Sequence, residues 1–180
     1  MVVCFLANGF EEIEALTPID CLRRCGIDVL TVGVNSSIIN GSHHIPVVCD
    51  TDTDTFEIPD DLQMLILPGG MPGTLNLENS IIVQKTIDHC ISNNIPIAAI
   101  CAAPSILGHK MILDGKNATC YPGFEKDLLG ANVVDENVVV DGNIITACGM
   151  GAAIEFSLAI IEKLISKERA VELLESIKRK

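Results

Sequence analysis

The stretch Asn94-Ile-Pro-Ile-Ala-Ala-Ile-Cys101-Ala-Ala-Pro104-Ser-Ile-Leu-Gly108 places one cysteine between a short apolar run and a proline. The run at residues 97–100 predicts a buried strand. Pro104 predicts the first turn of a helix, where a missing N–H is not needed for hydrogen bonding. Between a strand end and a helix start, free backbone N–H groups and the helix dipole favour a thiolate. Cys101 is therefore either a reactive thiol or, like most isolated cysteines, a small packed hydrophobe.

Outside this stretch, apolar runs alternate with helical patterns along the chain. We expect strands at residues 1–7, 28–34, 63–67, 97–100 and 144–147, and helices at 11–25, 81–92, 104–108, 152–165 and 167–180. Pro18 lies inside the first of these helices and predicts a bend or a late helix start. A hairpin is expected between residues 37–39 and 46–49, and a polar loop at 51–61. Strands alternating with helices indicate an α/β fold with a mostly parallel sheet covered on both faces, in one domain spanning residues 1–180.

Composition excludes several classes of partner and cofactor. The net charge is −12, which argues against binding to nucleic acid or anionic membranes because both require basic patches. No apolar run approaches the roughly 20 residues of a membrane span, and a cytoplasmic location is expected. The eight cysteines form no CxxC pair, so neither a metal site nor a disulfide framework is predicted. No GxGxxG or Walker lysine pattern indicates a nucleotide cofactor.

Three features follow strands that are expected to end at the same edge of the sheet. They are the acidic segment at residues 11–14, the Gly69-Gly70 turn and Cys101. Ligands of parallel α/β sheets bind at the carboxyl ends of the strands. A glycine-rich turn there either offers N–H groups to an oxyanion or is an ordinary tight turn. Their convergence predicts a carboxyl group, N–H groups and a thiol in one place.

Three motifs, in this order and spacing, resemble the ThiJ/PfpI family, which contains the Parkinson-disease protein and its bacterial relatives. They are Gly9-Phe-Glu-Glu-Ile-Glu14, Leu67-Pro-Gly-Gly70 and Ala98-Ala-Ile-Cys-Ala-Ala-Pro104. The resemblance covers almost the whole chain and places it in the class I glutamine amidotransferase-like superfamily. It implies a flavodoxin-like three-layer sandwich that forms homodimers and needs no cofactor.

The same resemblance assigns roles to residues at the predicted edge. Cys101 would be the reactive cysteine and Glu14 the carboxyl that hydrogen-bonds it. The Gly69-Gly70 turn and Ala102 would supply backbone N–H groups for an oxyanion. The implied activity is the conversion of glyoxal or methylglyoxal, free or as early protein adducts, to hydroxy acids. The alternative, from a different class, is a sensor of oxidative stress or a redox-regulated chaperone in which Cys101 oxidises without turnover.

The chain departs from the family pattern at positions that bear on mechanism. Tyr121 stands before a proline where some members carry a histidine, and tyrosine is a poor base at neutral pH. His44 occupies the place of an arginine found in some members, and its neighbour His43 is interpreted as a solvated turn residue. Tyr121, His44 and Glu11 are therefore accessory candidates. No histidine follows His109, which argues against a glutamine amidotransferase, and Tyr121 argues likewise against a protease of the related type.

Overall fold

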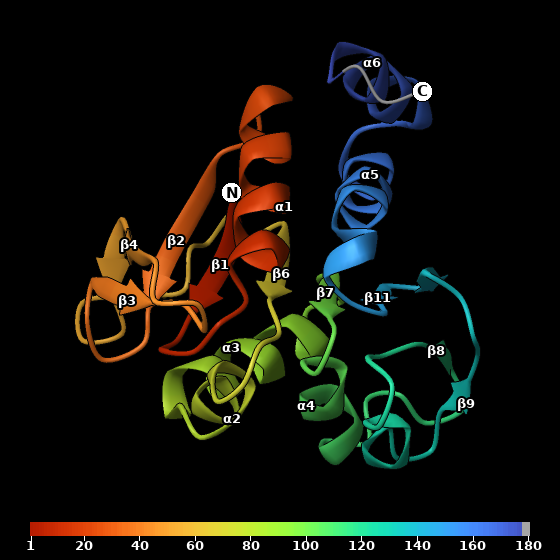
Figure 1. Ribbon diagram of the computed structural model, residues 1–180, viewed down its shortest axis with the longest axis horizontal. Coiled ribbons are helices and arrows are strands. Elements are labelled where there is room, and N and C mark those ends of the chain that lie inside the picture. Colours follow the sequence, from red (N-terminus) through yellow and green to blue (C-terminus); the bar gives the residue numbers. More distant parts are fainter. Residues whose placement is uncertain (178–180) are drawn as a thin grey trace.

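The computed structural model describes residues 1–177 and contains a central sheet with helices on both faces (Figure 1). In the described part of the chain this sheet has seven strands in the order β10-β11-β7-β6-β1-β2-β5. Every neighbouring pair is parallel except β10 and β11. The strands are β1 (Val2–Leu6), β2 (Val29–Gly33), β5 (Thr51–Asp52), β6 (Met64–Leu67), β7 (Ile97–Ile100), β10 (Val138–Asp141) and β11 (Ile144–Ala147).

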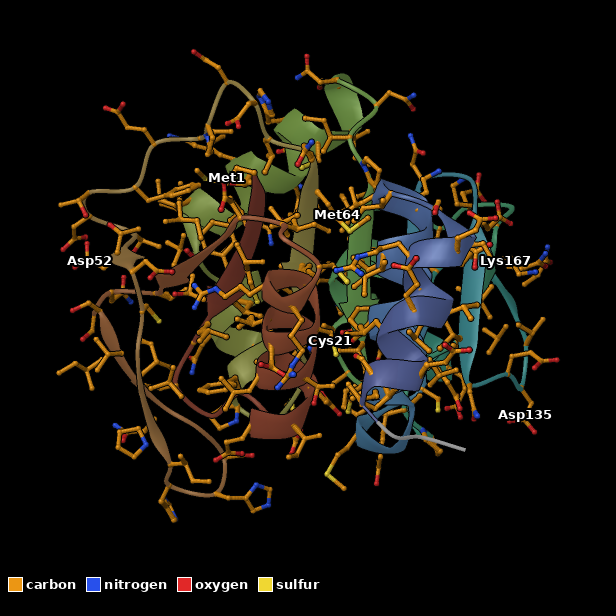
Figure 2. All side chains as sticks on the ribbon, turned by 90° about the horizontal axis from the view of Figure 1, so that it is seen from above. Met1, Cys21, Asp52, Met64, Asp135 and Lys167 are labelled. Atoms are coloured by element: carbon orange, nitrogen blue, oxygen red, sulfur yellow. The ribbon has the colours of Figure 1, made fainter. Side chains whose placement is uncertain are left out.

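Six α-helices within residues 1–177 complete a three-layer sandwich. One face is covered by α1 (Glu12–Arg24) and α5 (Ala153–Leu164), with α6 (Lys167–Ser176) packed on α5, and the other face by α2 (Gly73–Glu78), α3 (Ile81–Ser92) and α4 (Pro104–His109). Figure 2 looks onto the first face, where α1 and α5 lie side by side over the sheet. The predicted flavodoxin-like α/β fold is confirmed.

Side-chain alternation along the central strands divides the core into two layers. Cys4 and Leu6 of β1 pack with Phe156 of α5 on one face, whereas Val3 and Phe5 pack with the other helices. All four of these β1 side chains are fully buried, as expected for a parallel strand covered on both faces. The uninterrupted apolar run at the start of the chain therefore places β1 at the centre of the molecule.

Smaller elements lie outside the central sheet. The predicted hairpin is present as β3 (Ile38–Asn40) paired antiparallel with β4 (Pro46–Val48), and its connecting turn extends over residues 41–45. A second pair, β8 (Asn117–Ala118) and β9 (Asn132–Val133), is parallel. Two 3₁₀ turns, η1 (Glu125–Asp127) and η2 (Met150–Ala152), precede β9 and α5 respectively.

The structure corrects three expectations. Of the bend or late start expected for the first helix, the late start is wrong, because α1 begins at Glu12 with Glu11 as its N-cap. The loop expected at residues 51–61 begins with β5, whose two residues pair with Val32 and Gly33 of β2. Helix α2 occupies a segment where no helix was predicted. Residues 178–180 of the last predicted helix lie outside the described residues, and α6 ends at Ser176.

No helix in residues 1–177 is both long and apolar enough to cross a membrane.

Candidate active site

The first turn of α1 carries the buried acid of the site. The Glu11 carboxylate caps the helix by accepting the N–H of Glu14 at 2.8 Å, and the N–H of Glu11 donates to the carbonyl of Gly69 at 2.9 Å. These two bonds fix the start of α1 against the turn that follows β6. Glu14 is only 1% exposed, and its Oε2 accepts the N–H of Gly69 at 3.1 Å. The acid is therefore held between α1 and the end of β6.

Cys101 directly follows β7 and is half-buried in an unusual backbone conformation. Its φ is 64°, in the left-handed region that residues other than glycine seldom adopt. Its N–H donates to the carbonyl of Ala147 at 2.8 Å, and its carbonyl accepts the N–H of Tyr121 at 2.8 Å. Helix α4 then begins at Pro104. Such strain persists only where the surroundings hold it, and these two hydrogen bonds hold it here.

The acid and the thiol meet at the ends of three neighbouring strands, β1, β6 and β7. The Glu14 carboxyl is hydrogen-bonded to the Cys101 thiol, and the N–H groups of Gly70 and Ala102 point at the Cys101 sulfur. Gly69 lies between the two side chains. A Cβ at Gly69 would lie 2.6 Å from the Cys101 Cβ and 2.6 Å from the Glu14 Oε2. Only glycine fits at this position without moving the pair apart.

Burial determines the ionisation of this pair. It raises the pKa of Glu14 from 4.5 to about 7, with the hydrogen bond to Cys101 opposing the shift and the charge of Glu11 adding to it. Burial also raises the pKa of Cys101, as does the negative charge of ionised Glu14, and the N–H groups of Gly70 and Ala102 oppose this. Protonation of Glu14 removes that charge and makes the carboxyl a hydrogen-bond donor. The thiolate is therefore favoured only when the proton resides on Glu14.

The accessory candidates lie at different distances from this pair. The ring of Tyr121 borders it, because a Cβ at Gly149 would be 3.1 Å from that ring and 3.9 Å from the Glu14 Oε1. Glu11 acts on Glu14 in two ways: its carboxylate caps α1 by accepting the N–H of Glu14, and its negative charge raises the pKa of the Glu14 carboxyl. His44 is exposed, and within residues 1–177 no hydrogen bond or ion pair joins its side chain to Glu14 or Cys101. The structure does not bring His44 into this site.

A second buried acid, Glu12, was missed from the sequence. It is 4% exposed, and its Oε1 accepts the N–H of His43 at 2.8 Å while its Oε2 lies 3.0 Å from the His43 Nδ1. Burial opposes ionisation of Glu12, but the hydrogen bonds from His43 and its neighbours prevail and lower the pKa to about 2. His43 is an exposed turn residue, as expected, but its N–H and its ring also attach the β3–β4 turn to α1. The attachment of the turn to α1 depends on a contact between residues distant in the sequence, and no local sequence pattern signals it.

One group of side chains in residues 1–177 has the residue types and spacing of a metal site. The ligand atoms of Glu11, Glu12 and His43 lie within 4.8 Å of one another. Both Glu12 oxygens already accept hydrogen bonds from the β3–β4 turn, and the Glu11 carboxylate accepts the α1 cap bond. The arrangement is thus explained by the attachment of the turn to α1.

Comparison with known proteins places this geometry in a family. Residues 1–163 match the model of the DJ-1/PfpI family. Protein DJ-1 homolog B of Arabidopsis thaliana is 38% identical over 172 residues, which cover 93% of this chain and 39% of the plant protein. The chain spans 44% of homolog A from the same plant, so it corresponds to less than half of either relative. A deglycase of Pyrococcus abyssi is 34% identical over 150 residues, covering 81% of this chain and 88% of that protein.

The solved structures agree with the sequence relatives. The structure of Toxoplasma gondii DJ-1, described as oxidized, superposes with a TM-score of 0.93 at 31% identity, covering 98% of this chain and 96% of that one. That of Drosophila melanogaster DJ-1beta gives a TM-score of 0.92 at 35% identity, with coverage of 98% and 96%. The chain belongs to the DJ-1/PfpI family.

Proposed function

We propose that this chain converts reactive dicarbonyls, such as methylglyoxal or its early adducts on proteins, to hydroxy acids, with Cys101 as nucleophile and without a cofactor. The observation that carries the proposal is the buried acid in hydrogen-bond contact with the thiol at the end of β7. The Pyrococcus abyssi relative named a deglycase supports the same reaction class. Family membership alone supports a role of the DJ-1 type.

The reaction begins with addition of the Cys101 sulfur to the aldehyde carbon of methylglyoxal. The new C–S bond places negative charge on the former carbonyl oxygen, where the N–H groups of Gly70 and Ala102 stabilise it; Gly69 is already engaged by Glu14. Glu14 protonates this oxygen, then takes the proton from the former aldehyde carbon and returns it to the neighbouring carbon. It also carries the hydroxyl proton from the first oxygen to the second, which leaves a thioester. The resulting thioester is hydrolysed by water, which releases lactate and the free thiol.

Glu14 carries all the proton transfers in this scheme. Tyr121, at the position of the histidine of some family members, donates hydrogen bonds but is a poor base at neutral pH. The pKa of Glu14, raised to about 7, suits a group that must both accept and donate a proton near neutral pH. We therefore assign Tyr121 to substrate binding at the rim of the site.

The test is to incubate the full chain with methylglyoxal and to follow lactate. Cys101→Ala and Glu14→Gln should each lower the rate at least a hundredfold, because one removes the nucleophile and the other the proton carrier. Cys25→Ser is the matched control, since Cys25 is also half-buried but lies at the far end of α1. Lactate production that survives in Cys101→Ala would refute the assignment, and full activity of Glu14→Gln would refute the role of that acid.

A second candidate function is sensing of peroxide by Cys101. The relative from Toxoplasma gondii was solved in an oxidized state, and Cys101 is one of only three half-buried thiols among the eight cysteines, the other five being buried. Mass spectrometry after mild peroxide treatment distinguishes the two functions. Oxidation that begins at Cys101, without lactate production from methylglyoxal, would favour the sensor. Equal oxidation of all eight cysteines would exclude it.

We also propose that the chain forms a homodimer through α1 and the β3–β4 hairpin. Exposed apolar side chains gather on these two elements, namely Ile13, Leu16, Ile38, Ile45 and Val48, the last of them 74% exposed. The bonds between Glu12 and His43 hold the two elements together. Val48→Asp should halve the molar mass measured by light scattering, and an unchanged mass would contradict this interface.

A cytoplasmic location, proposed from the acidic composition, is tested by cell fractionation.

A further inference from the structure

A second cysteine lies beside Cys101 on the neighbouring strand. β7 and β11 run parallel with Ile100 opposite Ala147, so the next residues on the two strands are Cys101 and Cys148. The N–H of Cys101 donates to the carbonyl of Ala147, which shows that the pairing continues to this point. Neighbouring strands lie about 4.8 Å apart, and disulfides join Cα atoms roughly 4.4–6.8 Å apart. The backbone spacing therefore permits a bond between these two sulfurs.

Both cysteines also turn to the same face of the sheet. Along β7 and β11, Ile100 and Ala147 face the α1–α5 layer, so strict alternation would send the following residues to the opposite face. Instead Cys101 and Cys148 both pack against the α1–α5 core. At Cys101 the left-handed backbone accounts for the change. Burial raises the pKa of the Cys148 thiol, and the charges of Glu155, Asp135 and, least of the three, Glu14 act in the same direction.

Cys148 is free to react, whereas the other cysteine near the site is not. The Cys148 sulfur is half-buried and has only a weak contact, 3.8 Å from the Asn137 Oδ1. Cys120 precedes Tyr121, whose N–H bonds to the Cys101 carbonyl. Its side chain, however, is buried in the core on the other face of the sheet. Cys148 is thus the thiol placed to reach an oxidised Cys101.

We propose that Cys148 is the resolving thiol for Cys101 after oxidation by a hydroperoxide. The Cys101 thiolate attacks the outer peroxide oxygen, the O–O bond breaks, and the leaving hydroxide or alkoxide takes the proton held by Glu14. Cys101 is now a sulfenic acid. The Cys148 thiolate then attacks this sulfur, the S–O bond breaks, and the departing hydroxide takes a proton to become water. The peroxide is reduced by two electrons and the two thiols are oxidised to one disulfide.

This inference goes beyond the proposed aldehyde reaction, although both use Cys101. The aldehyde reaction requires Cys101 as a free thiol, so the disulfide would inhibit that reaction reversibly. Disulfide formation would also compete with the further oxidation of Cys101 to sulfinic acid, which is irreversible without a dedicated repair enzyme. An external dithiol would restore both thiols.

The test is to treat the fully reduced chain with a small excess of hydrogen peroxide, at least two equivalents because a sulfinate consumes two, to block free thiols by alkylation, and to analyse it by mass spectrometry without reduction. Wild type should lose two hydrogens, give a peptide pair linked through Cys101 and Cys148, and return to the reduced mass with dithiothreitol. In Cys148→Ser the linked peptides should vanish and Cys101 should gain two oxygens as sulfinate. The control Cys25→Ser should form the disulfide as wild type does.

Two outcomes would overturn the inference, namely sulfinate at Cys101 in wild type without a linked peptide, or a link from Cys101 to Cys120. Lactate production from methylglyoxal, measured with the same reduced samples, separates this failure from that of the proposed function. Turnover by a wild-type chain that forms no disulfide refutes the resolving role alone. A disulfide in a chain without turnover refutes the aldehyde reaction alone.

Discussion

Replacement of Glu14 by glutamine should stabilise the protein at alkaline pH while it abolishes turnover. Glu14 has a pKa of about 7 in the folded chain against 4.5 for an unperturbed carboxyl. The difference of about 2.5 units corresponds to about 3 kcal/mol of unfolding free energy, at 1.36 kcal/mol per unit. Between pH 4.5 and 7 the folded state binds the proton and the unfolded state does not. The free energy of unfolding therefore falls as pH rises through this window, and above pH 7 the whole of this loss is present.

A glutamine at this position keeps the shape but carries no charge. Its amide oxygen can accept the N–H of Gly69, and its NH₂ can donate to the Cys101 sulfur. Glu14→Gln should thus unfold with about 3 kcal/mol more free energy than wild type at pH 8, and the two should converge near pH 4.5. Urea unfolding followed by far-ultraviolet circular dichroism measures this. The control Glu57→Gln changes an exposed loop carboxyl and should alter stability little at either pH.

The reasoning would be refuted if Glu14→Gln were less stable than wild type at pH 8, or if its advantage did not shrink on acidification. Either result would mean that the ionised carboxyl gains more from its N–H partners than it loses by burial. A gain in stability together with a loss of lactate production would instead show that this acid is kept for chemistry at a cost to the fold.

Three further outcomes are expected. Gly69→Ala should lower the free energy of unfolding by about 1–3 kcal/mol and abolish turnover, because its Cβ would overlap the side chains of Glu14 and Cys101. The control Gly151→Ala, which has open space around it, should change the free energy of unfolding little. Urea unfolding measures both. His43→Phe should lower amide-exchange protection in residues 41–45 at pH 6. This difference should fade as pH rises through the raised pKa of His43, since only the protonated ring pairs fully with its buried acid; a pH-independent difference would contradict the pairing. Phe156→Ala, at a fully buried position, should cost about 3–5 kcal/mol in the same urea assay, and a loss below 1 kcal/mol would contradict its place in the core.

The sequence predicted elements best where local signals coincide. The predicted bounds of α3 agree with the structure, in which Ser80 caps the start of the helix by accepting the N–H of Val83. Helix α2 was missed because it starts after Pro72 without a side-chain cap, at the end of a glycine-rich turn. Strand β5 was missed because two polar residues become a strand only by pairing with the edge of β2.

Some contacts of the candidate site could likewise be predicted from the sequence and others could not. Glu14, Gly70 and Cys101 could be placed together from topology, because each follows a central strand and parallel strands end at one edge. The attachment of His43 to Glu12 depends on a buried contact between residues 31 positions apart, for which no local pattern exists. The same holds for Cys148, whose position beside Cys101 follows from the pairing of β7 with β11 and not from any spacing in the sequence.

The unequal burial of the eight cysteines also makes the chain its own reporter of unfolding. Five thiols are buried and three are half-buried in the native fold. A brief pulse of alkylating reagent on the native protein should therefore add few labels, whereas the unfolded chain should take all eight. Both core layers contain such thiols, since Cys4 and Cys21 lie in one and Cys90 and Cys120 in the other. The order in which these four become labelled in rising denaturant would show whether the two layers open together or one at a time.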